Sequence, residues 1–409
     1  MYKVPASEEI TEKARRAKEK KASLGPDIDL SHYSSQAEKL PEMDLSSLSR
    51  KEQEVMALAG IDVTGKNRSG TFVQMDHSVV CEAVNQEGVE VLSTDEALKK
   101  HSWLREYWWK AVPVDADKYT SQAELKWTKG YFLRALPGVK SVYPLQACLF
   151  LSQDGIAQNV HNLIIVEPGA ELHIITGCAV GLDVRSGLHI GVSEFYVKKG
   201  GKLTFTMIHN WSKGVAVRPR SAAIVEEGGL FLSNYICLQP LDNLQMYPTA
   251  YLDGKDAVAR FNSILLATPG SLLDVGARVF LRQPESRTEI VSRAIAKGGK
   301  IWARGHLIGE APNIKAHLEC NGLILDKEGF IHAIPELEAR TNNVEMSHEA
   351  AVGRIAKDEI TYLMARGLSE EEATATIVRG FLNVKIEGLP PELQEQLDRV
   401  AKYSEQFIL

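Results

Sequence analysis

Three side chains near the end of the chain combine the donor types that hold iron or zinc in proteins. Cys320 lies in the stretch LECNG, and His348 and Glu349 follow in the stretch EMSHEA, 28 residues further on. A thiolate is a soft ligand, whereas an imidazole and a carboxylate are harder ones, and mixed sets of this kind bind transition metals. The pattern therefore favours handling of a metal or of sulfur over hydrolysis.

Adjacent residues on a strand point to opposite faces of a sheet. His348 and Glu349 therefore serve one centre only if the chain turns between them, or else each faces a different partner. Taken singly, Cys320 is also compatible with a small buried core residue, and the His348–Glu349 pair with a polar surface.

The cysteine content limits what this site can be. The chain has five widely spaced cysteines, and none forms a C-x-x-C pair: Cys81, Cys148, Cys178, Cys237 and Cys320. Neither a zinc ribbon nor a redox dithiol motif is present. Cys148 and Cys178 lie among apolar neighbours and are predicted to be core residues, while the place of Cys237 stays open. Free thiols and a charged start, MYKVPASEEITEK, predict a cytoplasmic protein.

The composition excludes several other classes of protein. The chain has 409 residues, 44% hydrophobic and 24% charged, with a formal net charge of −6. These values are typical of a soluble globular protein and provide no basic surface for nucleic acid. No uncharged apolar run is long enough to cross a membrane.

Residues 1–112 are predicted to form an N-terminal helical region. Three stretches there are rich in helix formers or have an apolar face. They are Glu8–Ala22, Leu45–Ala59 and Thr94–Ala111.

Residues 113–345 change to a β pattern with a recurring glycine. A heptad of the form apolar-x-x-Gly-small-x-apolar appears as VEPGAEL, VKKGGKL, VEEGGLF, ATPGSLL and IAKGGKI, with first glycines at Gly169, Gly200, Gly228, Gly270 and Gly298. The spacings of 31, 28, 42 and 28 residues are close to multiples of about 14. Regular spacing of a turn and a strand predicts a stacked solenoid, in which distant residues align in ladders. The alternative is a set of ordinary hairpins with Gly-Gly turns.

Residues 346–409 are predicted to form a C-terminal helical domain. Ala356–Arg366 ends at Gly367, and Ser369 with Glu372 forms a capping box before Ala373–Phe381. A third helix is expected after Pro390 and Pro391.

One short motif resembles a nucleotide site and is set aside. Gly60 to Lys66 matches the start of a phosphate loop, but Asn67 stands where the magnesium-binding hydroxyl belongs. A helical stretch precedes the motif where a strand is required. Any ATPase that acts with this protein is therefore expected on a separate chain.

Several longer segments resemble the SufB/SufD family of iron–sulfur cluster assembly scaffolds, from about residue 90 to the C-terminus. They are ALKKHSWLREYWW, VYPLQACLFLSQ, LIIVEPGAELHIITGCA, HNW, HLECNGLIL and EARTNNVEMSHEAAVGRIAKDEITYLMARGLSEEEATATIVRGF. The resemblance implies a mainly β fold, with a right-handed parallel β-helix between N-terminal and C-terminal helical regions. It implies a scaffold and not an enzyme. It also implies pairing with a like protomer through the β-helix, as a homodimer or a SufB–SufD-type heterodimer.

The same resemblance implies roles for individual residues and partners. Cys320 matches the cluster-associated cysteine, and His348 and Glu349 match the histidine–glutamate pair near the protomer interface. Together they would be the ligands of a transient iron–sulfur cluster. The C-terminal helices would bind a SufC-like ABC ATPase, and a cysteine desulfurase would be a possible sulfur donor.

Two features depart from the bacterial SufB pattern. No N-terminal cysteine cluster occurs, and the stretch Ala222–Gly229 lacks the sulfur-accepting cysteine, from which Cys237 is displaced. The sulfur donor and its point of entry are therefore open. The departures are compatible with a reduced Suf-type system in which one protein serves as both SufB and SufD and forms a homodimer, and the presence of a second scaffold subunit is left open.

Two other functions are compatible with the sequence. A SufD-like structural partner would bind no cluster of its own; Glu349 after His348 disfavours it, because the SufD pattern has glycine there, although the tail HEAAVGRI is also SufD-like. A carbohydrate-active β-helix enzyme would need clustered acids on one face, which the glycine repeats lack.

Overall fold

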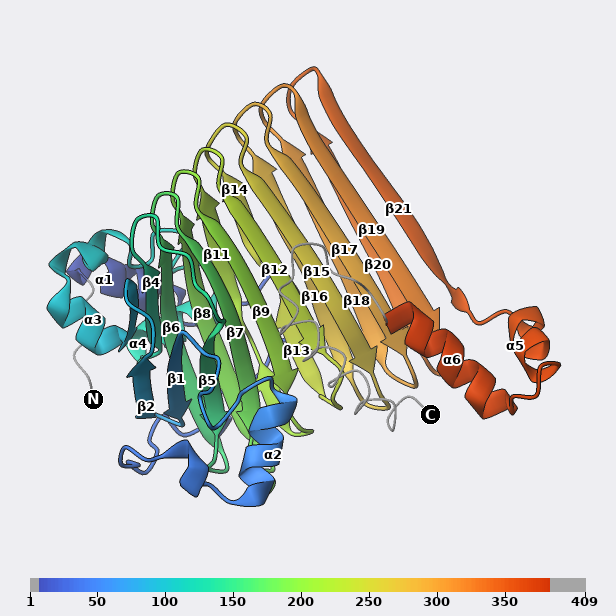
Figure 1. Ribbon diagram of the computed structural model, residues 1–409, viewed down its shortest axis with the longest axis horizontal. Helices are drawn as coiled ribbons and strands as arrows, with labels where there is room; N and C mark the ends of the chain where they lie inside the picture. The colour runs from blue at the N-terminus through green and yellow to red at the C-terminus, as the bar shows by residue number, and fades with distance from the viewer. Residues whose placement is uncertain (1–6, 383–409) are drawn as a thin grey trace.

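Two long sheets wind together into a parallel β-solenoid of about eight turns, with helices at both ends (Figure 1). The computed structural model describes residues 7–382. The ten-stranded sheet contains, in spatial order, β2 (Ser78–Val84), β1 (Gly70–Met75), β5 (Leu145–Leu151), β7 (Glu171–Val180), β9 (Lys202–Asn210), β12 (Leu230–Cys237), β15 (Val258–Ala267), β17 (Arg287–Ala296), β19 (Ile314–Ile324) and β21 (Val344–Arg354).

The eleven-stranded sheet faces it across the core. Its strands are β3 (Val89–Ser93), β4 (Tyr131–Ala135), β6 (Ile156–Val166), β8 (Gly187–Val197), β10 (Val215–Val217), β11 (Arg220–Val225), β13 (Asn243–Met246), β14 (Thr249–Leu252), β16 (Leu272–Leu281), β18 (Lys300–Gly309) and β20 (Phe330–Ala339). β10 and β11 pair with successive parts of β8, and β13 and β14 with successive parts of β16, so each pair acts as one interrupted strand.

The glycine heptads form the corners of the coil. Gly169, Gly200, Gly228, Gly270 and Gly298 all have positive φ, between +63° and +91°. A residue with a Cβ adopts this conformation at a cost, whereas glycine does not. The strands that flank these corners pair in parallel, as in β7–β9 and β9–β12. The solenoid prediction is therefore confirmed, and the hairpin alternative is wrong for this segment.

Helices occupy both ends, close to where the sequence predicts them. They are α1 (Glu8–Ala17), α2 (Arg50–Leu58), α3 (Thr94–Lys100), α4 (Lys118–Leu125), α5 (Lys357–Met364) and α6 (Glu370–Leu382), with short 3-10 turns at Leu30–His32, Leu45–Ser47 and Ser102–Glu106. The predicted helix after Pro390 lies outside the described residues. No helix within residues 7–382 is long and apolar enough to cross a membrane.

The structure differs from the expected regional boundaries in two places. The region 1–112, expected to be helical, contains β1, β2 and β3, because β1 extends the ten-stranded sheet in parallel with β5 and Phe72 of β1 is buried in the main core. The region from 346 onward, expected to be helical, begins inside β21, which pairs with β19 along its whole length. Each added strand gains backbone hydrogen bonds with its neighbour, so β1 and β21 extend the ten-stranded sheet beyond the expected boundaries.

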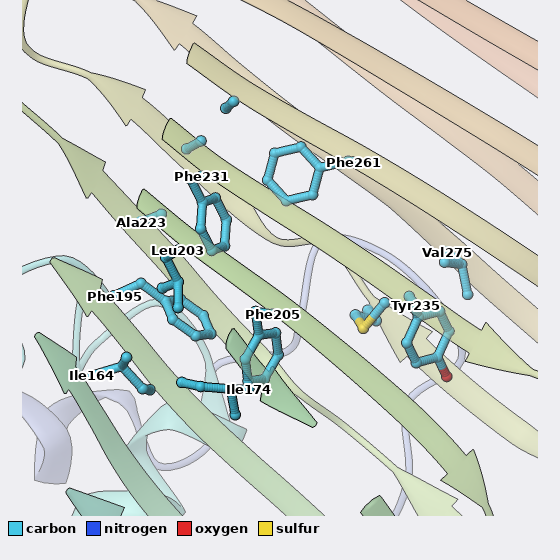
Figure 2. Close-up of a cluster of buried hydrophobic side chains, with 14 of the residues drawn as sticks. Ile164, Ile174, Phe195, Leu203, Phe205, Ala223, Phe231, Tyr235, Phe261 and Val275 are labelled. Atoms are coloured by element: carbon cyan, nitrogen blue, oxygen red, sulfur yellow. The ribbon is translucent and has the colours of Figure 1, made fainter. Parts of the chain in front are cut away.

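The interior of the coil is apolar and filled by stacked side chains. Phe195 on β8 packs against Phe205 on β9 and Phe231 on β12, and Phe231 packs against Phe261 on β15, with ring centroids 4.7 to 5.8 Å apart (Figure 2). Cys178 and Cys237 are buried in the same core. Cys148 is also buried, beneath α2 on the outer side of the ten-stranded sheet. The core prediction for Cys148 and Cys178 is confirmed.

The two ends of the solenoid differ. The N-terminal end is covered by antiparallel additions to the sheets, β2 on β1 and β3 on β4, and by helices. At the C-terminal end, β20 and β21 each have one strand neighbour within the described part of the chain. Apolar side chains remain exposed there, including Leu337 on β20 and Val352 on β21. One chain therefore leaves the last turn of its core partly uncovered.

Candidate functional site

The predicted ligands lie on β19 and β21, the last two strands of the ten-stranded sheet. These strands pair in parallel, with Leu318 opposite His348, Glu319 opposite Glu349 and Cys320 opposite Ala350. Paired residues on these two strands are 30 positions apart, so the spacing of 28 residues places His348 two positions before Ala350, the residue opposite Cys320. Because the side-chain period of a strand is two, Cys320 and His348 lie on the same face.

That shared face is the inner one. Along β19, Ala316, Leu318 and Cys320 are buried, whereas Lys315, His317 and Glu319 between them are partly or fully exposed. Cys320 is 3% exposed and belongs to the main hydrophobic core. The opposite residue on its other neighbour, β17, is Ser292. The sulfur therefore faces the interior of its own coil, one strand from the open end.

The environment of Cys320 stabilises the protonated thiol. Burial raises the pKa of this thiol to about 11, and the neighbouring Glu319 carboxylate contributes in the same direction. Burial in apolar surroundings disfavours the charged thiolate, and a nearby negative charge does the same. At neutral pH the free side chain is a neutral thiol, so a metal that binds it must displace a proton.

His348 lies at the uncovered inner edge of the last turn. It is exposed, as are its neighbours on β21 from Ser347 to Arg354. The core closes tightly next to it, because a Cβ added at Gly322 would lie 3.0 Å from Val352 Cγ2 and 3.1 Å from Ile331 Cδ1. The side chains of β20 and β21 thus form an apolar inner wall beside an exposed imidazole.

Glu349 lies on the outer face, beside Glu319, and not with the other two residues. Glu319 accepts a hydrogen bond from Asn321 Nδ2 and lies 4.0 Å from Arg293 Nη2. The Arg293 guanidinium in turn lies 6.0 Å from the ring of Phe381 on α6. On the outer face, Arg293 therefore lies between Glu319 and α6.

α6 is held on this outer face by apolar contacts. Val378 and Leu382 are buried against Ile236, Ile264 and Ile295, which project from three successive strands. By contrast, Tyr362 and Met364 of α5 are exposed. The helical pair therefore presents one face to the sheet and another outward.

A single chain does not assemble the three predicted residues into one metal centre. Within residues 7–382, no three His, Cys, Asp or Glu side chains lie close enough together to hold a metal ion. Cys320 and His348 share a face, while Glu349 is directed away from them. The two inner donors are too few for an iron–sulfur cluster, which is held by about four ligands.

Comparison with known proteins adds the family. Residues 149–381 match the model described as SUF system FeS cluster assembly, SufBD core domain. The chain belongs to the SufBD family. A SufBD family protein of Methanothermobacter thermautotrophicus (strain Delta H) is 47% identical over 96% of this chain and 97% of its own length.

Two further relatives extend this comparison. A SufBD family protein of Archaeoglobus fulgidus is 50% identical over 88% of this chain and 96% of its own length. The iron-sulfur cluster assembly protein SufB of Bacillus subtilis is 33% identical over 83% of this chain and 74% of its own length. This SufBD protein therefore takes part in iron–sulfur cluster assembly, and the carbohydrate-active alternative is set aside.

Sequence reasoning missed the outer-face neighbours of the candidate site. Arg293, Glu319 and Asn321 are distant from Phe381 in the sequence and carry no motif. The alternation along β19 was the available signal, since it places residues 317, 319 and 321 on the face opposite Cys320. Which helix covers that face depends on packing, which the strand pattern does not contain.

The raised pKa of Cys320 predicts how its alkylation depends on pH. Because the thiolate is the reactive form, the rate of iodoacetamide labelling at Cys320 should rise about tenfold per pH unit from pH 7 to pH 9.5, without a plateau. Peptide mass spectrometry at each pH measures this rate, and the same measurement in unfolded protein, where the thiol has its ordinary pKa, is the reference; Cys81 is no such reference, because burial raises its pKa as well. A plateau below pH 9 would contradict the neutral-thiol assignment.

Proposed function

We propose that this SufBD protein is a cytoplasmic, SufB-type scaffold that builds a transient iron–sulfur cluster where two copies meet. The observation that carries the proposal is the placement of Cys320 and His348 on one face at the uncovered end of the solenoid. The free thiols within the described residues agree with a reducing compartment.

A second copy would complete the donor set that one chain lacks. Closed dimers are usually two-fold symmetric, so the partner would present the same surface and the same residues. Two thiols and two imidazoles would then be available, which is a known type of cluster ligation. The exposed apolar residues of the last turn, such as Leu337 and Val352, would be buried by the same contact.

The apolar wall explains how such a cluster can be both formed and released. Iron binding would replace the proton of Cys320, and the burial that disfavours a free thiolate would keep water from the bound metal. Imidazole ligands carry less negative charge than thiolates, so a mixed set holds the cluster less firmly. The nascent cluster would therefore be cargo that the protein hands on, and not a resident cofactor.

Glu349 is proposed as a ligand that takes the place of His348 after a movement of β21, because adjacent residues of a strand point to opposite faces. It lies on the outer face, so it can reach the inner donors only if this strand rolls about its own axis. β21 is paired on one side in the described structure, which makes it the strand least constrained against such a movement.

A SufC-like ABC ATPase is proposed to drive that movement through α5 and α6. Its binding would shift the population of the two arrangements according to its affinity for each. The contact from Phe381 through Arg293 to Glu319 offers a physical link between the helices and the site. The stretch from Gly60 to Lys66 follows α2 and not a strand, and Asn67 stands in the place of the magnesium-binding hydroxyl, so an ATP site is not proposed for this loop. A cysteine desulfurase is the proposed class of sulfur donor.

The second candidate function is that of a SufD-like partner without a cluster of its own. The raised pKa of Cys320 favours it, because a protonated core thiol needs no metal. Iron content of the purified homodimer separates the two functions.

Replacement of Cys320 by serine should remove most of the bound cluster. After anaerobic reconstitution with iron and sulfide, we expect wild type to show cluster absorbance that Cys320→Ser lacks and that His348→Ala shows in part. Cys81→Ser, at the opposite end of the fold, should retain the wild-type signal. If Cys320→Ser holds as much cluster as wild type, the ligand assignment is wrong.

Charges at the open end should weaken self-association. Val352→Glu, at a position 41% exposed in one chain, places two carboxylates near the proposed two-fold seam and should raise the dimer dissociation constant at least about tenfold. Sedimentation velocity over a range of concentrations measures this. Val142→Glu, at a position 76% exposed near the N-terminal end, is the matched control, and an equal effect of both variants would place the interface elsewhere.

Removal of the Tyr362 side chain from the exposed face of α5 should weaken binding of the ATPase. Tyr362 is 56% exposed, and loss of an exposed aromatic anchor typically weakens an interface about tenfold or more. Co-purification of Tyr362→Ala with a tagged ABC ATPase tests this, with Leu182→Ala on the solenoid as the control. Wild-type recovery of the ATPase with Tyr362→Ala would exclude this face.

A further inference from the structure

A fully buried arginine lies between the eleven-stranded sheet and the N-terminal segment. Arg218 is 0% exposed and is among the largest completely buried side chains of the chain. Its Nη1 donates to the carbonyl oxygen of Val217 at 2.9 Å, and its Nη2 donates to that of Pro26 at 3.1 Å. These are neutral acceptors, so they satisfy hydrogen bonds without neutralising the charge.

A second arginine lies beside the first, over the same aromatic ring. The guanidinium carbons of Arg218 and Arg220 lie 5.5 and 4.9 Å from the ring centroid of Tyr119. Arg220 Nε donates to Asp117 Oδ2 at 2.7 Å. The other oxygen of Asp117 accepts from the backbone amides of Tyr119 and Thr120, as the N-cap of α4.

The charges in this cluster do not balance. Arg218 and Arg220 bring two positive charges, and Asp117 brings one negative charge. The nearby Asp27 carboxylate is already paired with Lys118, with its Oδ1 2.5 Å from the lysine Nζ, so it does not neutralise either arginine. Within the described part of the chain, Arg218 has no carboxylate partner. Burial also lowers the pKa of Arg218, as expected for a cation removed from water.

Several buried polar atoms here have no hydrogen-bond partner within the described residues. Three can donate, namely Arg218 Nε, Arg220 Nη2 and the Tyr119 hydroxyl, and this hydroxyl lies near enough to Arg218 to oppose the lowering of the pKa of that guanidinium. Two are amide oxygens, Asn243 Oδ1 and Gln245 Oε1. An unpaired buried charge costs several kcal/mol, on the order expected for broken buried ion pairs. The unpaired donors on the two guanidinium groups indicate a missing partner that accepts hydrogen bonds and carries negative charge.

We propose that the cluster of Arg218, Arg220 and Tyr119 binds a small inorganic oxyanion such as phosphate or sulfate. The three unpaired donors would point to its oxygens, and a guanidinium matches an oxyanion in both charge and geometry. A half-turn of the Asn243 and Gln245 amides would present NH2 groups to the anion in place of oxygens.

The bound anion would fasten the N-terminal segment to the coil. Arg218 is hydrogen-bonded to Pro26, and Gly25 lies so close to Gln245 that a Cβ there would collide with its side chain. Tyr119 and Asp117 belong to the start of α4. One anion would therefore connect the segment around residue 26, α4 and the interrupted strand formed by β10 and β11. This site lies far along the chain from Cys320 and is independent of cluster assembly.

Phosphate titration of the anion-free protein tests the inference. The protein is purified without phosphate or sulfate, and its melting temperature is followed as phosphate replaces chloride at constant ionic strength. A ligand that binds the native state alone raises the melting temperature in a saturable manner. Isothermal titration with phosphate gives the affinity, and Arg218→Met should weaken it about 10- to 100-fold, the range for a hydrogen bond to a charged group.

Arg282→Met is the matched control. Arg282 also lies over aromatic rings, at 4.3 Å from Tyr251, but it is solvent-accessible and paired with Asp253. Its loss should leave phosphate binding unchanged, and any general effect of phosphate on stability should remain in both variants.

A further measurement covers the case in which Arg218→Met does not fold. Wild-type protein saturated with phosphate and passed over a desalting column is denatured in acid, and the released anion is quantified by ion chromatography. About one phosphate per chain supports the proposal. No saturable phosphate or sulfate response in the wild type, or equal affinity in wild type and Arg218→Met, would overturn it.

Discussion

In-register parallel pairing of successive turns is the constraint on which the rest of this structure depends. Each corner glycine turns the chain so that the next strand starts in register with a strand of the previous turn. Residues about thirty positions apart thereby become neighbours on adjacent strands. Backbone hydrogen bonds then hold every row in place, and a slip of one residue would exchange the inner and outer faces. The candidate site is a direct product of this register, because it decides that Cys320 and His348 share a face and that Glu349 does not.

The chemistry of Cys320 follows from the same packing. A core position suits a neutral thiol, and the raised pKa expresses the cost of placing a thiolate there. A metal cation changes the balance, because it supplies the positive charge that the surroundings lack. Burial and metal binding are therefore compatible, provided that iron can enter the last turn. The open end next to β21 is the nearest route, and this makes the uncovered edge part of the site.

The two ends of the solenoid differ in how far their core is covered. At the N-terminal end, antiparallel strands and helices cover the core. The arginine cluster lies on the side of the coil, between the eleven-stranded sheet and the N-terminal segment, where the unpaired guanidinium atoms of Arg218 and Arg220 motivate the proposed anion. At the C-terminal end, edge strands and apolar side chains remain exposed within the described residues. The proposed pairing of two copies would cover this edge, which in a single copy is open to non-specific strand pairing.

The repeating part of this protein could be predicted from local sequence patterns. The heptads around Gly169 to Gly298 predicted a solenoid because their spacing and their need for positive φ are local properties, and the capping residues around Ser369 predicted a helix for the same reason. The sequence also identified Cys320, His348 and Glu349 as candidates by donor type. The strands β1 to β3 were missed because they are short and because β1 and β3 pair with strands that lie far along the chain, β5 in one sheet and β4 in the other. Only the tertiary structure decided which faces these three residues occupy, that α6 reaches the row of Glu319 through Phe381 and Arg293, and that Arg218 is buried without a carboxylate. Those facts depend on pairing between distant segments, and no local preference of the chain records which distant segment a residue will meet.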